Sequence, residues 1–238
     1  MERLDDLQLC GLKILQDPER FCFGMDAVLL SGFVQVPDGA PVLDMCTGTG
    51  ILPLLMSAKT KAGQISAIEI QPESADMARR SVELNHLSDR IRIVTGDIKE
   101  ADRLFGAASF AVVTCNPPYI AGGKGLQNPE APKAIARHEV FCTFRDVAEQ
   151  SAKLLTPGGK LFLVHRPDRL SELLVTLTGC GLEPKRLRIV YPFADKAPNM
   201  VLIEAARGGR PGITVEKPLI IYDAPGRYSE EIRRDYGF

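Results

Sequence analysis

The segment Pro41-Val42-Leu43-Asp44-Met45-Cys46-Thr47-Gly48-Thr49-Gly50 is typical of a short apolar strand followed by a glycine loop, and residues 51–58 continue as an apolar helix. A strand, a tight glycine loop and a helix, in this order, form the first unit of a nucleotide-type α/β fold. Gly48 and Gly50 let the backbone turn sharply and approach a ligand, and the helix start offers free N–H groups. A dinucleotide fingerprint would place a third glycine where Pro53 stands, so the loop disfavours NAD and FAD.

Two further strands end in acidic residues. The first, Ile65 to Ile70, carries Glu69 near its end, about twenty residues past the loop, where a carboxylate accepts hydrogen bonds from ribose hydroxyls. The alternative is that Glu69 is an ordinary solvated acid at the end of a strand, which would show the same spacing from the loop. The second, Ile91 to Val94, is followed by Asp97, which suits either an adenine amino group or the cap of a helix beginning near Ile98.

The next strand begins at Phe110 and ends at Asn116-Pro117-Pro118-Tyr119. Two prolines fix φ and supply no N–H, so the Asn116 amide and the neighbouring carbonyls are held outward as a rigid polar clamp with an aromatic lid. A proline-rich strand exit that merely breaks the sheet is the alternative. Because parallel strands end at one edge of a sheet, we expect the glycine loop, the two acids and Asn116 to lie together there.

A cofactor with an adenosine end and a small charged end would account for the two loop glycines, for an acid that binds ribose and for an acid that binds adenine. It would also account for the absence of a pyrophosphate-binding fingerprint. S-adenosylmethionine fits this description. A planar amine is a poor nucleophile, because its lone pair is delocalised. Acceptors on the Asn116 side chain and the Pro117 carbonyl would favour the charge that builds on it, while Tyr119 stacks on the planar target. No strong base is needed, since the proton becomes acidic once the nitrogen is alkylated.

The candidate residues follow from these segments. Phe23 and Gly24 precede Asp26, a predicted helix cap, and either contact the ligand or belong to an ordinary packed helix. The expected catalytic residues are Asn116, Pro117, Pro118 and Tyr119, and the expected cofactor-binding residues are Phe23, Gly24, Asp44, Cys46, Thr47, Gly48, Gly50, Glu69, Ile70, Asp97, Ile98 and Asn116.

The rest of the chain is predicted as one domain over residues 1–238, with an N-terminal extension, 1–40, contacting the cofactor site and a C-terminal extension, 207–238. Residues 120–137 form either a substrate flap or a connector. Further strands are expected over 160–165, 185–191 and 199–206, with a charged tail at the end. His165 receives no chemical role, and Arg166 and Arg169 are candidates for phosphate.

Charge, cysteine content and hydropathy limit the classes of protein to which this chain can belong. The formal net charge is -1, but residues 1–120 carry -5 and residues 121–238 carry +4, which permits a basic face for a polyanion in the second half. Six cysteines are spread without a C-x-x-C pair, so we expect no metal site and reduced thiols in a cytoplasmic protein. The charged N-terminus does not resemble a signal peptide, and no apolar run suffices to cross a bilayer.

In combination, residues 44–50, Glu69, Gly96-Asp97 and residues 116–119 resemble the class I S-adenosylmethionine-dependent amino-methyltransferases. The stretches Phe23-Gly24-Met25-Asp26-Ala27, Ala136-Arg137-His138-Glu139 and Val164-His165-Arg166-Pro167 resemble, more narrowly, the bacterial tRNA(Val) adenine N6-methyltransferase family. That resemblance implies a seven-stranded, mostly parallel sheet with the last strand antiparallel, cofactor contacts at the loop, Glu69 and Asp97, and target-base contacts at 116–119. It also implies methyl transfer to the N6 of an adenine in tRNA.

Other functions remain open on the sequence. A protein glutamine N5-methyltransferase presents the same planar N–H₂ to the same tetrapeptide, although a large specificity domain before the fold would favour it, and only about forty residues precede the loop. Methylation of an exocyclic amine in DNA or rRNA is a further alternative. An RNA-binding module without turnover is disfavoured by the intact Gly48, Gly50, Glu69 and Asn116, and a nicotinamide dehydrogenase by Pro53.

Overall fold

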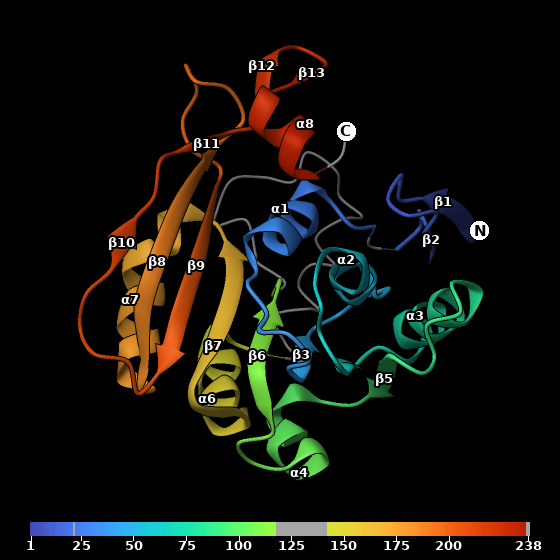
Figure 1. The fold of residues 1–238 in the computed structure, drawn as a ribbon, viewed down its shortest axis with the longest axis horizontal. Coiled ribbons are helices and arrows are strands. Elements are labelled where there is room, and N and C mark those ends of the chain that lie inside the picture. Colours follow the sequence, from blue (N-terminus) through green and yellow to red (C-terminus); the bar gives the residue numbers. More distant parts are fainter. Residues whose placement is uncertain (21, 118–141, 237–238) are drawn as a thin grey trace.

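The computed structural model describes residues 1–20, 22–117 and 142–236, and a mixed sheet forms the centre of this part of the chain (Figure 1). Its strand order is β10-β8-β9-β7-β6-β3-β4-β5, with β11 paired to β8. The strands span Val42–Met45 (β3), Ile65–Glu69 (β4), Ile91–Thr95 (β5), Phe110–Cys115 (β6), Leu155–His165 (β7), Leu182–Tyr191 (β8), Met200–Arg207 (β9), Thr214–Val215 (β10) and Leu219–Ile220 (β11).

The strand directions confirm the expected topology. Strands β5, β4, β3, β6 and β7 are parallel to their neighbours, whereas β9 lies antiparallel between β7 and β8. Since β9 is the seventh strand of this core along the chain, the seven-stranded sheet with an antiparallel last strand is present. The short β10 and β11 extend it by pairing parallel to β8.

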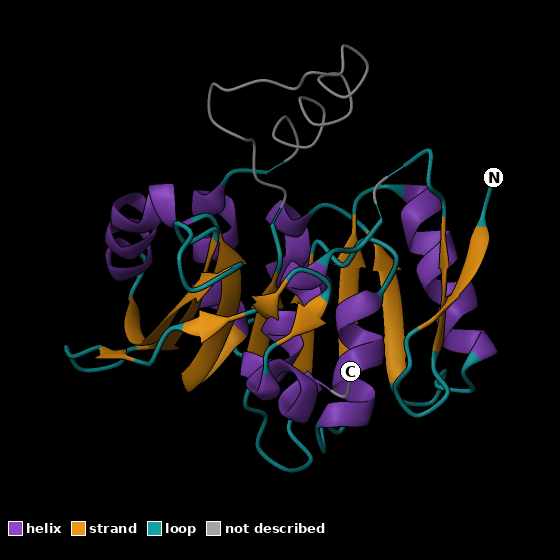
Figure 2. Ribbon diagram, turned by 90° about the horizontal axis from the view of Figure 1, so that it is seen from above, coloured by secondary structure: helices purple, strands orange, loops and turns teal. Residues whose placement is uncertain are grey.

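Helices cover both faces of the sheet, as Figure 2 shows from above. One face packs against α1, α2 and α3, and the other against α4, α6 and α7. Short 3₁₀ turns, η1 and η2, precede α4 and α7. The bounds are Met25–Phe33 (α1), Ile51–Lys59 (α2), Pro72–Leu84 (α3), Ile98–Glu100 (η1), Ala101–Phe105 (α4), Phe144–Leu154 (α6), Pro167–Arg169 (η2) and Leu170–Gly179 (α7).

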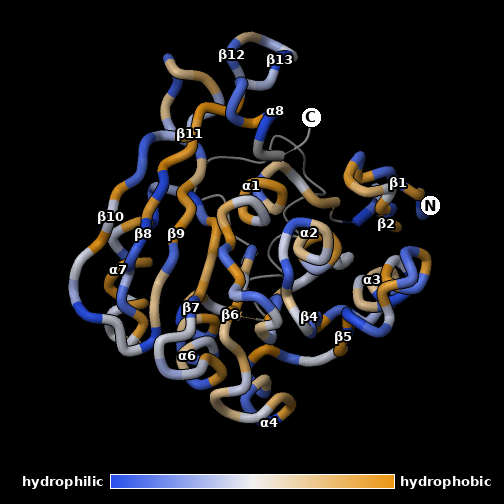
Figure 3. Tube along the Cα trace, in the orientation of Figure 1, coloured by the Kyte–Doolittle hydropathy of each residue, from blue (hydrophilic) through white to orange (hydrophobic). Residues whose placement is uncertain are grey.

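Strand periodicity divides the core into two layers. Successive strand residues face opposite sides, so Val42 joins the cluster under α1 and α2, whereas Leu43 and Met45 join the cluster under α6 and α7. In β7, Phe162 and Leu163 divide in the same way. Figure 3 shows the resulting concentration of hydrophobic residues along the central strands. Because both faces are covered, these strands are apolar throughout rather than alternating with polar residues.

The N-terminal residues form a hairpin of β1 (Arg3–Asp6) and β2 (Lys13–Gln16), for which the sequence showed no sustained period. The hairpin is attached to α3. The backbone N–H of Leu15 donates to Ser81 Oγ at 2.9 Å, and that of Lys13 donates to Asn85 Oδ1 at 2.9 Å. These outward-facing backbone N–H groups of β2 are therefore satisfied by side chains of α3 and its C-cap instead of by a strand of the main sheet.

The C-terminal residues correct a second expectation, because the predicted charged tail contains the helix α8 (Glu230–Tyr236) after a small hairpin of β12 (Tyr222–Ala224) and β13 (Arg227–Tyr228). Ile232 is fully buried beside α1, and its N–H donates to the Ser229 hydroxyl at 3.3 Å. One buried apolar residue and a capping serine therefore anchor a segment that is otherwise rich in charge.

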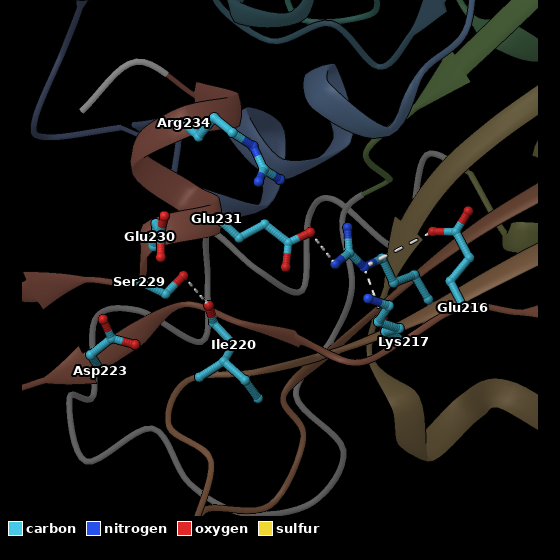
Figure 4. Close-up of a pocket in the computed structure, with 9 residues that line it drawn as sticks. Glu216, Lys217, Ile220, Asp223, Ser229, Glu230, Glu231 and Arg234 are labelled. Atoms are coloured by element: carbon cyan, nitrogen blue, oxygen red, sulfur yellow. Dashed lines mark hydrogen bonds and ion pairs between the residues drawn. The ribbon is translucent and has the colours of Figure 1, made fainter.

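A hollow of about 730 Å³ is lined by residues of β8, of the segment 216–223 and of α8 (Figure 4). Arg188 on β8 bridges its two sides, because its guanidinium bonds to Glu231 of α8 and to the Lys217 carbonyl. The dashed lines in Figure 4 mark these interactions. We interpret this arginine as a tie that holds the C-terminal segment against the edge of the sheet.

Several predicted boundaries were wrong. The first helix begins at Met25 with Gly24 at its N-cap, so Asp26 lies inside the helix, where its Oδ1 accepts from the N–H of Ala27 at 2.9 Å. Strand β7 begins at Leu155 rather than at residue 160, and its pairing with β6 shifts register between Phe110 and Val112. Glycines and a proline after Leu155 thus mark an irregular strand start and not a loop.

One expectation falls on undescribed residues. The predicted flap or connector over residues 120–137 lies outside the described ranges. Within those ranges, no helix combines the length and the apolar character needed to cross a membrane.

Candidate functional site

The glycine loop between β3 and α2 turns through three left-handed residues. Cys46, Gly48 and Gly50 have φ values of 57°, 58° and 88°, respectively. A Cβ on Gly48 would meet no atom within 4 Å, whereas one on Gly50 would lie 3.1 Å from the Cβ of Ala78 on α3. Gly50 therefore allows close packing of the two helices, and Gly48 leaves open space above the loop.

Glu69 at the end of β4 holds this loop in place. Its side chain is 5% exposed, its Oε2 accepts from the backbone N–H of Gly48 at 2.9 Å, and its Oε1 accepts from the N–H of Gln71 at 2.9 Å. The solvated-acid interpretation of Glu69 is thereby excluded. Oε1 also accepts from the side-chain amide of Gln71 at 3.4 Å, whereas Oε2 retains a lone pair that can accept from a ribose hydroxyl.

Asp44 is the most deeply buried acid of the site, with no exposed surface. The Thr114 hydroxyl of β6 donates to its Oδ1 at 2.6 Å, while Asp44 Oδ2 and Thr47 Oγ1 have no hydrogen-bond partner among the described residues. Burial raises the pKa of Asp44 to about 7, and the nearby Thr114 and Thr47 hydroxyls oppose that rise. Two buried polar atoms without partners, beside a loop with open space above it, are typical of a ligand site.

Asp97 and Ile98 follow β5 at the same edge. The Asp97 side chain is half-buried and accepts from the N–H of Lys99 at 2.9 Å, so it caps η1 as the helix-cap interpretation expected. Ile98 is buried in the core under α6. The N–H of Gly96 donates to the Glu69 carbonyl at 2.9 Å, which ties the end of β5 to the end of β4.

Asn116 and Pro117 leave the central strand β6 next to the glycine loop. Met45 of β3 and Cys115 of β6 are paired in register, so Cys46 and Asn116 occupy matching positions just beyond the two strand ends. Asn116 is half-buried and Pro117 is buried. The other two members of the predicted clamp, Pro118 and Tyr119, lie outside the described residues.

The N-terminal candidates lie before α1. The backbone N–H of Phe23 donates to Gln16 Oε1 at 2.9 Å, and its ring packs against the core cluster under α1 and α2. Gly24 is the N-cap of α1, and Ile70 is half-buried just after β4. For Phe23 and Gly24 these contacts support the packing interpretation, and a ligand contact stays a prediction.

Sequence reasoning missed two residues that support the acids. Thr114 and Gln71 were assigned no role, although they bond to Asp44 and Glu69. A polar residue within the apolar run 110–115 was the signal for Thr114. Assigning a role to Thr114 from that signal requires the knowledge that β3 and β6 are neighbours, and strand order cannot be derived from periodicity.

His165 ends β7 at the same edge and is 1% exposed. Its Nδ1 accepts from the N–H of Arg166 at 2.8 Å, and its ring meets Phe144 edge-on, with centroids 6.0 Å apart. Burial, followed by the charge of Arg169, lowers the pKa of His165 to about 4. The imidazole is therefore neutral at physiological pH and carries its proton on Nε2.

Known proteins match this chain over most of its length. A relative from Tolumonas auensis, "tRNA1(Val) (adenine(37)-N6)-methyltransferase", is 32% identical, covering 95% of this chain and 89% of its own. A relative from Porphyromonas gingivalis with the same name is 32% identical, covering 89% and 85%. The TRM5/TYW2 methyltransferase domain family matches residues 30–115.

Solved structures agree on the fold. A protein described as a predicted O-methyltransferase from Agrobacterium tumefaciens superposes with a TM-score of 0.73 at 23% identity, covering 90% of this chain and 96% of its own. TYW2 from P. horikoshii, solved in complex with MeSAdo, gives a TM-score of 0.59 at 17% identity, covering 87% and 72%. With this fold and with relatives above 30% identity over nearly the whole length, the chain belongs to the tRNA1(Val) (adenine(37)-N6)-methyltransferase family.

Proposed function

We propose that this protein transfers a methyl group from S-adenosylmethionine to the N6 of an adenine in tRNA. The observation that carries the proposal is the meeting of the loop 46–50, Glu69, Asp97 and Asn116 at the carboxyl edge of the sheet, where open α/β folds bind ligands. The names of the relatives supply the substrate class.

The residues present fit this cofactor. The two partnerless atoms, Asp44 Oδ2 and Thr47 Oγ1, suit the amino-acid end, which offers ammonium donors and carboxylate acceptors. Glu69 suits the ribose hydroxyls, because both its oxygens are already oriented by backbone N–H groups. Asp97 suits the adenine amino group, and Gly48 keeps the loop surface open. When bound, S-adenosylmethionine would supply the electrophilic methyl group.

The acceptor half of the site relies on positioning rather than on a base. The Asn116 side-chain oxygen and the Pro117 carbonyl would accept hydrogen bonds from the two N–H groups of the target amine, which stabilises positive charge on that nitrogen as it is alkylated. The proton can then leave to water. His165 is not needed as a base, and its low pKa agrees with a structural role.

We propose that the tRNA approaches across the more basic second half of the chain. Arg166 and Arg169 follow β7 at the site edge, with side chains 45% and 30% exposed, each paired with an acid of its own turn. Phosphates can compete for such exposed pairs, since these pairs are worth little in water. A tRNA substrate places the protein in the cytoplasm. The single domain over 1–238, with 1–40 forming one side of the cofactor site, belongs to the same proposal.

The experiment offers the protein labelled S-adenosylmethionine together with either total tRNA or release-factor protein, followed by nucleoside mass spectrometry of the RNA. We expect label in tRNA as N6-methyladenosine. Label only on protein would favour glutamine N5-methylation and overturn the proposal. Cofactor binding without label on any substrate would favour a binding module.

A further inference from the structure

Two cysteines separated by 96 residues meet beside the glycine loop. Cys46 follows β3 directly, Cys142 precedes Thr143, the N-cap of α6, and their Sγ atoms lie 3.9 Å apart. Both side chains are half-buried.

The backbone on both sides of the pair is well held. The N–H of Thr47 donates to the Ile68 carbonyl at 3.1 Å, and Thr143 forms a capping box with Asp146, whose Oδ2 accepts from the Thr143 N–H at 2.8 Å. A disulfide has an S–S length of about 2.05 Å, so the sulfurs must approach by about 2 Å. Rotation about the two Cα–Cβ bonds can supply a shift of this size without unfolding either segment.

The surroundings of the pair keep both thiols protonated. Hydrogen bonding with the buried Cys115 thiol raises the pKa of Cys46, hydrogen bonding with Cys142 opposes this, and burial adds to the rise. Contact with Cys46, and then burial, raise the pKa of Cys142. Because the thiolate is the nucleophile in thiol–disulfide exchange, we expect this pair to be oxidised slowly.

We propose that Cys46 and Cys142 are a redox modification site at which a small-molecule disulfide forms an intramolecular bond that blocks the cofactor loop. The first thiol attacks the oxidant and releases one small thiol, and the second thiol attacks the mixed disulfide and releases the other. Two cysteine thiols thus lose two protons and two electrons, and the oxidant becomes two thiols.

The bond would act on the loop that carries Thr47 and Gly48. Cys46 has a left-handed backbone conformation and directly precedes Thr47, whose Oγ1 lacks a partner among the described residues. A disulfide to Cys142 would displace Cys46 and so change the position of the neighbouring Thr47. The loss of cofactor binding rests on the proposed function of this loop, whereas formation of the bond does not.

The test incubates the full-length protein with glutathione disulfide, blocks the remaining thiols with N-ethylmaleimide, and maps peptides by mass spectrometry without reductant. We expect a linked peptide pair containing Cys46 and Cys142 that disappears after dithiothreitol. Calorimetric affinity for S-adenosylmethionine should fall about tenfold or more in the linked protein and return on reduction.

Two variants give the controls. Cys142→Ser should bind the cofactor normally and keep its affinity after oxidation, while Cys180→Ser, a half-buried thiol on α7's C-terminal side, should behave as the unmodified protein. A link from Cys46 to Cys115, or glutathione adducts without any linked pair, overturns the modification site. A Cys46–Cys142 link with unchanged affinity overturns the block. Failure of the reduced protein to bind cofactor counts against the proposed function alone, since the link is measured independently.

Discussion

The buried carboxyl of Asp44 predicts an unusual dependence of stability on pH. Burial raises its pKa to about 7 in the folded protein, against an ordinary value of 3.8, and its side chain has no exposed surface. The folded state therefore keeps a proton that the unfolded chain has released. The stability that this proton confers is complete below pH 3.8 and is lost as the pH rises to about 7.

The size of the effect follows from the shift. About three pKa units correspond to a penalty of roughly 4 kcal/mol for the ionised carboxylate above pH 7, and roughly 2 to 3 kcal/mol of it develops between pH 5 and pH 8. Asp44→Asn removes this penalty. The amide oxygen still accepts from the Thr114 hydroxyl, and the amide nitrogen can donate to Thr47 Oγ1, which has no other partner among the described residues.

Urea unfolding of the cofactor-free protein at pH 5, 6.5 and 8 measures the effect. We expect the free energy of unfolding of Asp44→Asn, relative to the unmodified protein, to increase by roughly 2 to 3 kcal/mol between the lowest and highest pH. Asp38→Asn serves as the control, because the Asp38 side chain is 75% exposed and pairs with the exposed Lys61 across 3.2 Å. A difference that does not change with pH would refute the reasoning. Asp44→Asn should nevertheless bind S-adenosylmethionine more weakly, since the amide lacks the negative charge that we assign to binding of the cofactor's ammonium group.

Three other predictions concern the site. Asn116→Ala should keep cofactor affinity within a few-fold while removing most turnover, because we propose that its side chain contacts the acceptor; equal loss of both in calorimetry and methylation assays would mean that the residue is structural. Arg166→Ala should weaken tRNA binding and lower the slope of log affinity against log salt by up to about one, whereas Lys61→Ala, at the opposite edge of the sheet, should leave the slope unchanged. Gly50→Ala should lower the free energy of unfolding in urea by about 1 to 2 kcal/mol, since φ is 88° and its Cβ would lie 3.1 Å from that of Ala78; an unchanged midpoint would contradict this.

The sequence alone determined the order of the elements and the strand-end positions of the acids. Local signals suffice for this, because apolar strands, glycine turns and a proline at the first helical position of α3 are set by backbone preference within a few residues. The errors fell where a long-range contact overrides composition. Burial of Ile232 against α1 makes a helix of the charged C-terminus, and bonds to Ser81 and Asn85 support a hairpin that shows no period.

Only the tertiary structure showed what each acid contacts. The Gly48 N–H donates to the Glu69 carboxylate, which excludes the solvated-acid interpretation, whereas the ribose contact stays a prediction. Asp97 caps η1, as the local sequence also allowed. The bond from Thr114 to Asp44 and the meeting of Cys46 with Cys142 join residues 70 and 96 positions apart, and burial by the folded chain raises the pKa of Asp44. Such contacts depend on strand order and helix packing, which bring distant residues into one low-dielectric environment. No periodicity along the chain encodes that arrangement.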